Sequence, residues 1–425
     1  MSLLLACLAD DFTGATDALE SLSLAGLHTV MFAAPPSAAA VATIPGLQAV
    51  VVASAARSWS RDEAGRVRPL LTALRDLSPR HVVFKVCSTF DSAPERGNIG
   101  RVIEIGAEVF AQSSTAVVPA APALERYAAF GNLFAAGSIG SGGEVHRLDR
   151  HPVMSRHPLT PMNESDLRRH LALQTNRSVG LFDVRQLALP WPARRDAWSA
   201  AIGAHEIVLC DLLHVDQQAE LGSLLDDGVD GGTPRFSVGS SGLTSSLGAH
   251  WNATGICSPR HCWPSVSPSV PVLAISGSCS AVTGRQINAA LAAGWVGVDA
   301  LSETATTAAA TALSQGRHTV LHTMIGPDDP RQLGGTPEIG ARLGRLASDI
   351  LKDLPKVRRL IFAGGDTSSH ALEQLQVATF RMITRISPGA PLCQGEGLEI
   401  VCKGGQAGPN DFFLLAAGSE LKETR

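Results

Sequence analysis

Short apolar runs alternate with longer segments of helical periodicity along most of the chain. The strands predicted in the first part are Leu3–Ala9, Thr29–Ala33, Ala49–Ala53, His81–Val86, Thr115–Val118 and Glu206–Cys210. Helices are predicted between them at Thr16–Ala25, Arg61–Asp76 and Asn98–Phe110. Such alternation is typical of parallel sheets covered by helices, because a parallel pair of strands needs a long crossover connection.

A second series of the same kind begins after Pro271. Its predicted strands are Val272–Ser276, Thr319–Thr323, Arg359–Ala363, Phe380–Ile386, Glu399–Lys403 and Phe412–Ala416, and its predicted helices are Thr283–Ala293, Ser302–Gln315, Pro337–Leu354 and Ser368–Leu375. The intervening segment, residues 251–270, has no apolar period and contains three prolines, which favours a linker. We therefore predict an α/β protein with domains at 1–250 and 271–425, each a mainly parallel sheet flanked by helices, and an active site in the cleft between them.

The amino-acid composition makes nucleic acids and membranes unfavoured partners. Of the 425 residues, 45% are apolar and 17% are charged, and the net charge is −4, so no global positive field exists to hold a nucleic acid. No apolar run is long enough for a membrane span. The first apolar run lacks a basic n-region, and the eight cysteines are scattered, so we expect reduced thiols in the cytoplasm.

The first candidate for chemistry is the block Ala9-Asp10-Asp11-Phe12-Thr13-Gly14-Ala15-Thr16-Asp17, where a buried strand meets a helix. Ligands of open α/β sheets bind just beyond the carboxyl ends of strands. Two adjacent carboxylates at this place repel each other unless a cation or a donor-rich ligand joins them. The simpler interpretation is that Asp10 or Asp11 caps the helix, which leaves the other carboxylate for chemistry.

A second block, residues 85–91, follows the strand His81–Val86 and supplies Lys85, Ser88, Thr89 and Asp91. Gly97-Asn98 then opens a helix whose N–H groups suit an anion. We expect Lys85 and Arg57 to hold a substrate carboxylate, since a buried lysine without a partner is uncommon; surface placement is the alternative.

The charged, proline-containing stretch 148–174, which includes His157, is interpreted either as a polar cleft or as a solvated connection.

In the second domain, three turns rich in small residues follow predicted strands, and their backbone N–H groups can approach phosphate oxygens closely. They contain Ser278 and Ser280; Gly364, Gly365, Asp366 and Thr367; and Gly404 and Gly405. Three such turns in one domain favour a nucleotide site.

Common catalytic signatures are missing from the sequence. We find no phosphate-binding P-loop, no dinucleotide fingerprint and no nucleophile elbow. Cys257, His261 and Cys262 lack a second correctly spaced pair, so no metal site is expected there.

Taken together, these blocks resemble the four-carbon acid sugar kinase family, in which a sugar-acid-binding domain precedes an ATP-binding domain. The resemblance runs in order through residues 9–17, Lys85 with Ser88-Thr89, Gly97-Asn98, residues 157–162, residues 277–280, residues 364–368 and Lys403-Gly404-Gly405. It implies phosphorylation of the terminal hydroxyl of a short sugar acid by ATP with Mg²⁺. The implied substrate contacts are Asp10, Arg57, Lys85, Ser88, Thr89, Asp91 and His157. Asp11 is the first candidate for the base or hydroxyl-orienting group, and Asp366 is the second.

The sequence leaves alternatives open for both the substrate and the class of protein. Residues 87–92 are similar to the 3-oxo-tetronate branch, whereas residues 121–126 and Lys403-Gly404-Gly405-Gln406 depart from it, which leaves room for a branched acid such as 3-oxo-isoapionate. A non-catalytic sensor of sugar acid and nucleotide is the main alternative, and a dehydrogenase is disfavoured by the absent fingerprint. A homodimer is compatible with the sequence.

Overall fold

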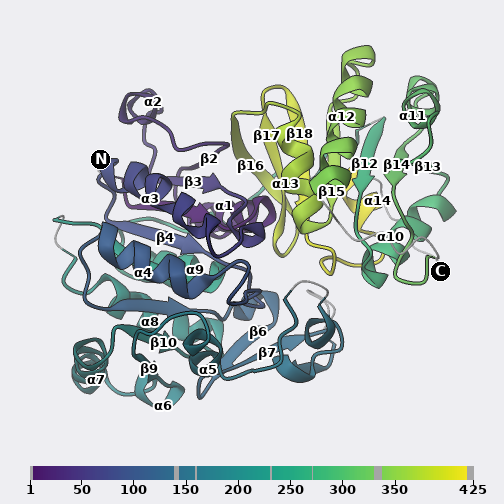
Figure 1. Ribbon diagram of the computed structural model, residues 1–425. Coiled ribbons are helices and arrows are strands. Elements are labelled where there is room, and N and C mark those ends of the chain that lie inside the picture. Colours follow the sequence, from purple (N-terminus) through teal and green to yellow (C-terminus); the bar gives the residue numbers. More distant parts are fainter. Residues whose placement is uncertain are drawn as a thin grey trace. The chain divides into compact units, whose positions relative to one another are not determined.

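The computed structural model describes residues 3–137, 143–157, 160–229, 232–269, 271–329 and 337–418; the side chains of Pro337, Asp366 and Thr367 lie outside this description. The chain divides into two compact units, with the change of unit between His261 and Cys262. Figure 1 labels the elements of both. Among the described helices, none combines the length and apolarity needed to cross a bilayer.

The first unit is built on a sheet in which every pairing is parallel. Its strands lie in the order β2 (Thr29–Phe32), β3 (Ala49–Ala53), β1 (Leu5–Ala9), β4 (His81–Lys85), β11 (Arg235–Gly239), β5 (Thr115–Val118), β10 (Ile207–Cys210) and β9 (Val179–Phe182). Their side chains are almost entirely buried, as expected for strands that are covered on both faces.

The helices of this unit form two groups. One group contains α1 (Phe12–Leu24), α8 (Gln218–Asp226) and α9 (Ser241–Ala253), and the other contains α3 (Val67–Asp76), α4 (Ile99–Val109) and α5 (Leu167–Ala172). Shorter or peripheral helices are α2 (Ala38–Ala42), α6 (Val184–Leu187) and α7 (Trp191–Ala204). A small antiparallel sheet consists of β6 (Arg126–Ala129), β7 (Asn132–Ala136) and β8 (Val145–Arg147). This small sheet was not predicted from the sequence.

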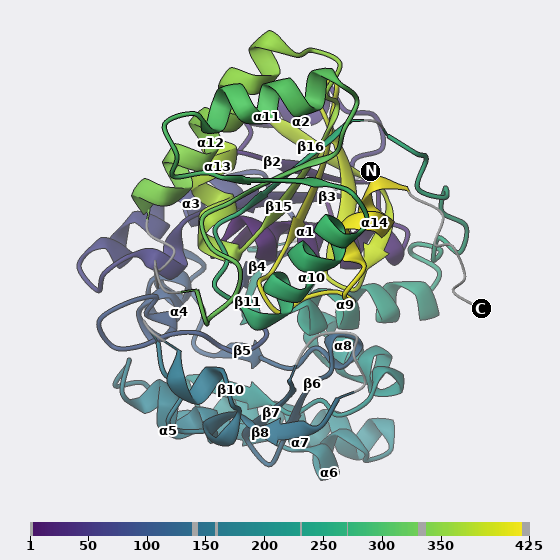
Figure 2. The same cartoon turned by 90° about the vertical axis from the view of Figure 1, so that its right-hand side faces the viewer.

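The second unit contains a mixed sheet, in which most neighbouring strands pair in parallel. The strands lie in the order β13 (Val296–Asp299), β14 (Thr319–His322), β12 (Val272–Ser276), β15 (Arg359–Ala363), β18 (Leu398–Lys403), β17 (Ala390–Gly395) and β16 (Thr379–Ser387). Only the pairings of β17 with β18 and with β16 are antiparallel. Figure 2 shows α11 (Ala305–Ser314), α12 (Pro337–Asp353) and α13 (Gly365–Glu373) on one side of this sheet, and α10 (Ala281–Ala292) and α14 (Phe412–Ala417) on the other.

The fold class predicted from the sequence is confirmed, but one element is of the wrong type. Residues 412–416, expected to form a strand, lie in helix α14. Its buried residues Phe412, Phe413, Ala416 and Ala417 recur with helical spacing, and Gly418 ends the helix in the left-handed region with φ 75°. A short apolar run does not reveal its period, because all of its residues are apolar whichever face is buried.

Candidate functional site

In the first unit, polar residues gather where parallel strands end. Strands β3, β1 and β4 are neighbours, so the residues that follow them lie at one edge of the sheet. Asp10 and Asp11 follow β1, Arg57 follows β3, and Lys85 is the last residue of β4. The structure therefore brings together four of the residues predicted from the sequence.

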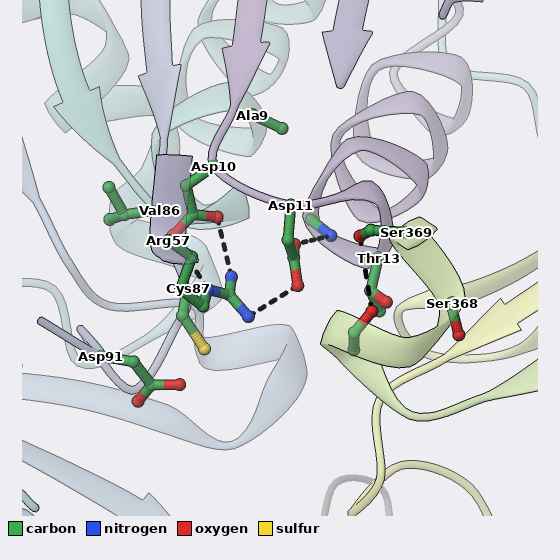
Figure 3. A network of polar contacts seen from close by, with 12 residues as sticks. Ala9, Asp10, Asp11, Thr13, Arg57, Val86, Cys87, Asp91, Ser368 and Ser369 are labelled. Atoms are coloured by element: carbon green, nitrogen blue, oxygen red, sulfur yellow. Dashed lines mark hydrogen bonds and ion pairs between the residues drawn. The ribbon is translucent and has the colours of Figure 1, made fainter. Parts of the chain in front are cut away.

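Arg57 joins the two adjacent carboxylates (Figure 3). Its Nη2 and Nε lie 2.7 and 3.1 Å from the two carboxylate oxygens of Asp10, and its Nη1 lies 2.6 Å from Oδ2 of Asp11. Burial raises the pKa of Asp10 to about 6, although Arg57 opposes the rise. The two carboxylates hold the pKa of Arg57 well above its usual value in spite of burial. The acidic pair is thus held by a cation of the protein itself.

Asp11 also caps helix α1. Its Oδ1 accepts a hydrogen bond of 2.5 Å from the backbone N–H of Gly14. A side chain at Gly14 would place Cβ 2.7 Å from that oxygen and 3.5 Å from Nζ of Lys85. The sequence left open which aspartate caps the helix, and the structure assigns the cap to Asp11. The cap uses one oxygen only, and Oδ2 of Asp11 accepts no hydrogen bond from the described residues.

Lys85 has a partner that the sequence analysis did not identify. Its Nζ lies 2.9 Å from a carboxylate oxygen of Asp17 on helix α1 and donates to the carbonyl of Val86 at 3.1 Å. Burial works against the charge, but the Asp17 carboxylate keeps the pKa of Lys85 above its usual value. Lys85 and Arg57 therefore do not need a substrate carboxylate to pair them, since protein carboxylates already do so.

Three more predicted residues lie just after β4. Ser88, Thr89 and Asp91 are buried, and the hydroxyl of Thr89 donates to Oδ1 of Asp91 at 2.7 Å. The Sγ of Cys87 lies 3.0 Å from the same hydroxyl. This segment therefore forms a buried polar wall next to Lys85.

His157 is placed differently from the other predicted substrate contacts. Its Nδ1 accepts hydrogen bonds from the backbone N–H and the hydroxyl of Thr160 at 3.1 and 2.9 Å. Within the described residues it makes no hydrogen bond to Asp10, Arg57 or Lys85. Pro158 and Leu159 of the same motif lie outside the described residues.

In the second unit, the turns after β12, β15 and β18 come together because these three strands are parallel neighbours. The N–H of Gly364 donates to the carbonyl of Lys403 at 3.0 Å. Gly364 has φ 121°, and a Cβ there would lie 3.5 Å from Ser278. A Cβ at Gly405 would lie 2.8 Å from Oγ of Ser278. Gly364 thus has a backbone conformation that favours glycine, and a side chain at Gly405 would press on the hydroxyl of Ser278.

Helices begin at two of these turns. Ser280 caps α10 by accepting a hydrogen bond of 3.2 Å from the N–H of Val282, and Gly365 is the first residue of α13. Asp366 and Thr367 lie in the first turn of α13, but their side chains are outside the described structure. Cys279, between β12 and α10, is exposed.

Lys403, which precedes the predicted glycines, is a further residue of this region. Its side chain is 0% exposed, its Nζ donates to the hydroxyl of Thr283 at 3.0 Å, and it lies 5.8 Å from the centre of the Phe412 ring. Burial lowers the pKa of Lys403 to about 7. Among the described side chains no carboxylate pairs with it. The sequence already indicated this residue, because Lys403 ends a predicted apolar strand just as Lys85 does.

These features of the second unit fit a nucleotide polyphosphate. Phosphate oxygens bind to backbone N–H groups at helix N-termini and to cations. The three turns provide two helix N-termini and the buried Lys403, which has no described counter-ion. The described residues contain no group of three or more His, Cys, Asp or Glu side chains that could hold a metal ion.

The two units correspond to two family models. Residues 5–247 match the sugar-binding N-terminal domain, and residues 273–413 match the nucleotide-binding C-terminal domain. A protein with this pair of domains belongs to a class that binds a sugar compound and a nucleotide within one chain. The chain is a member of the four-carbon acid sugar kinase family, so the resemblance found in the sequence is confirmed.

Relatives and solved structures match over nearly the full length. The 3-oxo-isoapionate kinase of Paraburkholderia graminis is 38% identical and covers 99% of this chain and 95% of its own. The 3-oxo-tetronate kinase of Methylobacterium radiotolerans is 33% identical, with coverage of 97% and 98%. A Salmonella typhimurium structure, described as a putative tRNA synthase, has 27% identity, a TM-score of 0.77, and coverage of 97% and 98%. A Haemophilus influenzae structure, at 24% identity and a TM-score of 0.71, covers 97% of this chain and 99% of its own and shows the same fold.

Proposed function

We propose that this chain transfers the γ-phosphoryl group of ATP to the terminal hydroxyl of a short 3-oxo sugar acid, with 3-oxo-isoapionate as the first substrate to test. The observation that carries the proposal is the match over almost the whole of both chains to a curated 3-oxo-isoapionate kinase at 38% identity, against 33% for a 3-oxo-tetronate kinase. The departures at residues 121–126 and 403–406 from the 3-oxo-tetronate pattern support the branched acid.

In this proposal the second unit binds the triphosphate. Backbone N–H groups near Ser278, Ser280, Gly364, Gly365, Gly404 and Gly405 would hold phosphate oxygens, with Asp366 and Thr367 at the start of α13. Mg²⁺ bound to the phosphates would neutralise charge during transfer. Because phosphoryl transfer asks for positioning and charge stabilisation rather than covalent chemistry, this set of donors suffices.

The first unit orients the acceptor. Both oxygens of Asp10 contact Arg57, whereas Oδ2 of Asp11 has only the ion pair with Nη1 and no hydrogen bond from a described residue. Oδ2 of Asp11 therefore has a lone pair to accept the proton of the terminal hydroxyl, with Arg57 holding the carboxylate in place. Asp366 is the second candidate for this role. Ser88, Thr89 and Asp91 would bind the other hydroxyls of the acid.

A coupled ADP-release assay over a panel of acids tests the function. The panel contains 3-oxo-isoapionate, 3-oxo-tetronates and tetronates, each with and without Mg²⁺, and ³¹P NMR of the product locates the phosphate. We expect Mg²⁺-dependent ADP release that is fastest with 3-oxo-isoapionate, and a phosphomonoester on the terminal carbon. Binding of acid and nucleotide without ADP release would favour the sensor, and consumption of a nicotinamide cofactor would favour a dehydrogenase.

The proposal also includes the cellular compartment and the oligomeric state of the enzyme. The proposed co-substrate is ATP, so we infer a cytoplasmic enzyme. We keep the homodimer as an expectation, which sedimentation velocity would test.

A further inference from the structure

Arg126 is a buried cation that the proposed chemistry has not used. Its side chain is 2% exposed, and Nη1 donates to the carbonyls of Leu124 and Glu125 at 2.8 and 3.3 Å. Its Nε is buried without a hydrogen-bond partner, and Nη2 donates to no described residue. No carboxylate in the described part of the chain forms an ion pair with it. A guanidinium with several unused N–H donors is costly to bury, so a ligand that pairs it is favoured.

The position of Arg126 places it at the same edge of the sheet as the acidic turn. It begins β6 after the loop that leaves the carboxyl end of β5, and β5 is separated from β4 only by β11. The charge of Arg126 interacts with Cys87 and Asp91 in the segment after β4. Cys87 in turn interacts with Arg57 and Asp10. Arg126 therefore lies near the segment after β4 that contains Ser88, Thr89 and Asp91.

The other cations at this edge are already neutralised. Arg57 is paired with Asp10 and Asp11, and Lys85 is paired with Asp17. Among the buried cations at this edge of the first unit, Arg126 is the one that has no carboxylate partner in the described residues. Burial lowers the pKa of Arg126, which shows that its surroundings do not compensate the charge fully.

We propose that Arg126 binds the carboxylate of the sugar-acid substrate through Nε and Nη2 and thereby selects acids over neutral sugars. The planar guanidinium offers two parallel N–H groups, which match the two oxygens of a carboxylate. With the carboxylate held there, the opposite end of a short acid is left to reach Asp11. This inference rests on the proposed function, because it names the residue that recognises the acid group of that substrate.

The test compares an acid with its neutral counterpart in the same enzyme. The acid is a 3-oxo-tetronate, and the neutral counterpart is erythrulose, in which CH₂OH replaces the carboxylate. We expect Arg126→Met to lower kcat/KM for the acid by about 10²-fold and to change that for erythrulose by less than about threefold, so that discrimination is nearly lost. The KM for ATP should stay the same.

Two controls separate recognition from folding. Arg150→Met removes an arginine whose side chain is 75% exposed in the same unit and should leave both substrates unaffected. Arg126→Lys keeps the charge and should keep a preference for the acid that Arg126→Met loses. Equal losses for acid and erythrulose in Arg126→Met would show a structural role and overturn the proposal, as would unchanged kinetics for the acid.

Failure of the proposed function would be recognised separately. If the wild-type protein released no ADP with any acid, thermal shift with the same acid would replace kinetics. We then expect stabilisation of the wild type and of Arg126→Lys, but not of Arg126→Met. If Arg126→Met does not fold, Arg126→Lys takes its place, and we expect it to prefer the acid less strongly than Arg150→Met does, because lysine lacks the two parallel N–H groups. An acid preference in Arg126→Lys equal to that in Arg150→Met would overturn the inference.

Discussion

Two lysines of this protein occupy equivalent places in different units and have opposite environments. Lys85 ends β4 and Lys403 ends β18, both strands pair in parallel with a neighbour, and both lysines are buried. Lys85 lies 2.9 Å from the carboxylate of Asp17, whereas Lys403 contacts the hydroxyl of Thr283 and the ring of Phe412. The pKa of Lys85 is raised, and that of Lys403 falls to about 7.

Lys85 has a counter-ion within the protein, whereas the counter-ion of Lys403 is expected to come with a ligand. Lys85 can stay charged whether or not substrate is present, because Asp17 compensates its burial. Lys403 becomes fully charged near neutral pH only when a negative group approaches it. A buried lysine at a strand end is therefore not enough to indicate a ligand site, and the presence or absence of its carboxylate decides the interpretation.

The largest effect is expected from removing the internal counter-ion. Asp17→Asn leaves Lys85 buried and unpaired, so we expect the free energy of unfolding of the first unit to fall by about 3–5 kcal/mol. Urea unfolding followed by near-ultraviolet circular dichroism measures it. Asp76→Asn, which breaks the exposed pair with Arg75 at 2.9 Å in the same unit, is the control and should cost less than about 1 kcal/mol. Similar small losses in both variants would remove the structural role assigned to Asp17.

Asp11, the N-cap of the helix that contains Asp17, is expected to affect the catalytic rate instead. Asp11→Asn preserves the cap on Gly14, since an asparagine oxygen can accept the same hydrogen bond. It removes the basicity of Oδ2, so kcat should fall about 10²-fold or more while the acid still binds. Steady-state kinetics and calorimetric titration of the acid distinguish the two. A near-normal kcat would move the role to Asp366 or to positioning alone.

For Lys403 the comparison predicts nucleotide binding that weakens as pH rises. The group has a pKa of about 7 in the free protein, so binding above that pH requires uptake of a proton. We expect the Kd for ATP to rise about 50-fold between pH 7 and pH 9. Calorimetry at pH 8 in buffers of different ionisation enthalpy should detect uptake of close to one proton. Lys403→Met should bind ATP weakly at both pH values and take up none, and an unchanged pH profile in this variant would refute the role.

The smallest effect is a pH dependence of stability with opposite sign for the two lysines. Because the folded-state pKa of Lys403 lies below the unfolded value, the unfolded state binds more protons above pH 7, and stability rises with pH. The gain is about 1 kcal/mol between pH 7 and pH 8. Lys85, with its raised pKa, contributes stability that is present below about pH 10.4 and lost above that value. The urea midpoints of wild type and Lys403→Met at the two pH values measure the difference, which should vanish if Lys403 stays protonated.

Most of the fold could be predicted from the sequence, because buried parallel strands form uninterrupted apolar runs between helices. Ala49–Ala53, Thr115–Val118, Val272–Ser276 and Arg359–Ala363 have the predicted bounds. The small sheet β6–β8 was missed, since its exposed and buried residues do not give a long apolar run. The helix α14 was taken for a strand because its apolar run hides its period.

The candidate site was predictable in its location but not in its pairing. Asp10, Asp11 and Lys85 could be placed at a strand edge because each follows or ends an apolar run. Asp17 could not be assigned to Lys85, since that ion pair depends on how α1 packs on the sheet. Arg126 could not be recognised as buried, because a sequence does not show which charged side chains lose contact with water.

The exposed thiol of Cys279 makes the turn between β12 and α10 a natural reporter. It lies between Ser278 and Ser280, whereas Cys393 and Cys402 of the same unit are buried. Alkylating reagents should therefore distinguish Cys279 from these two thiols, because reaction requires access to the sulfur. Labelling of this residue, followed by mass spectrometry, gives a footprint of the turn in the unaltered protein, without an engineered probe.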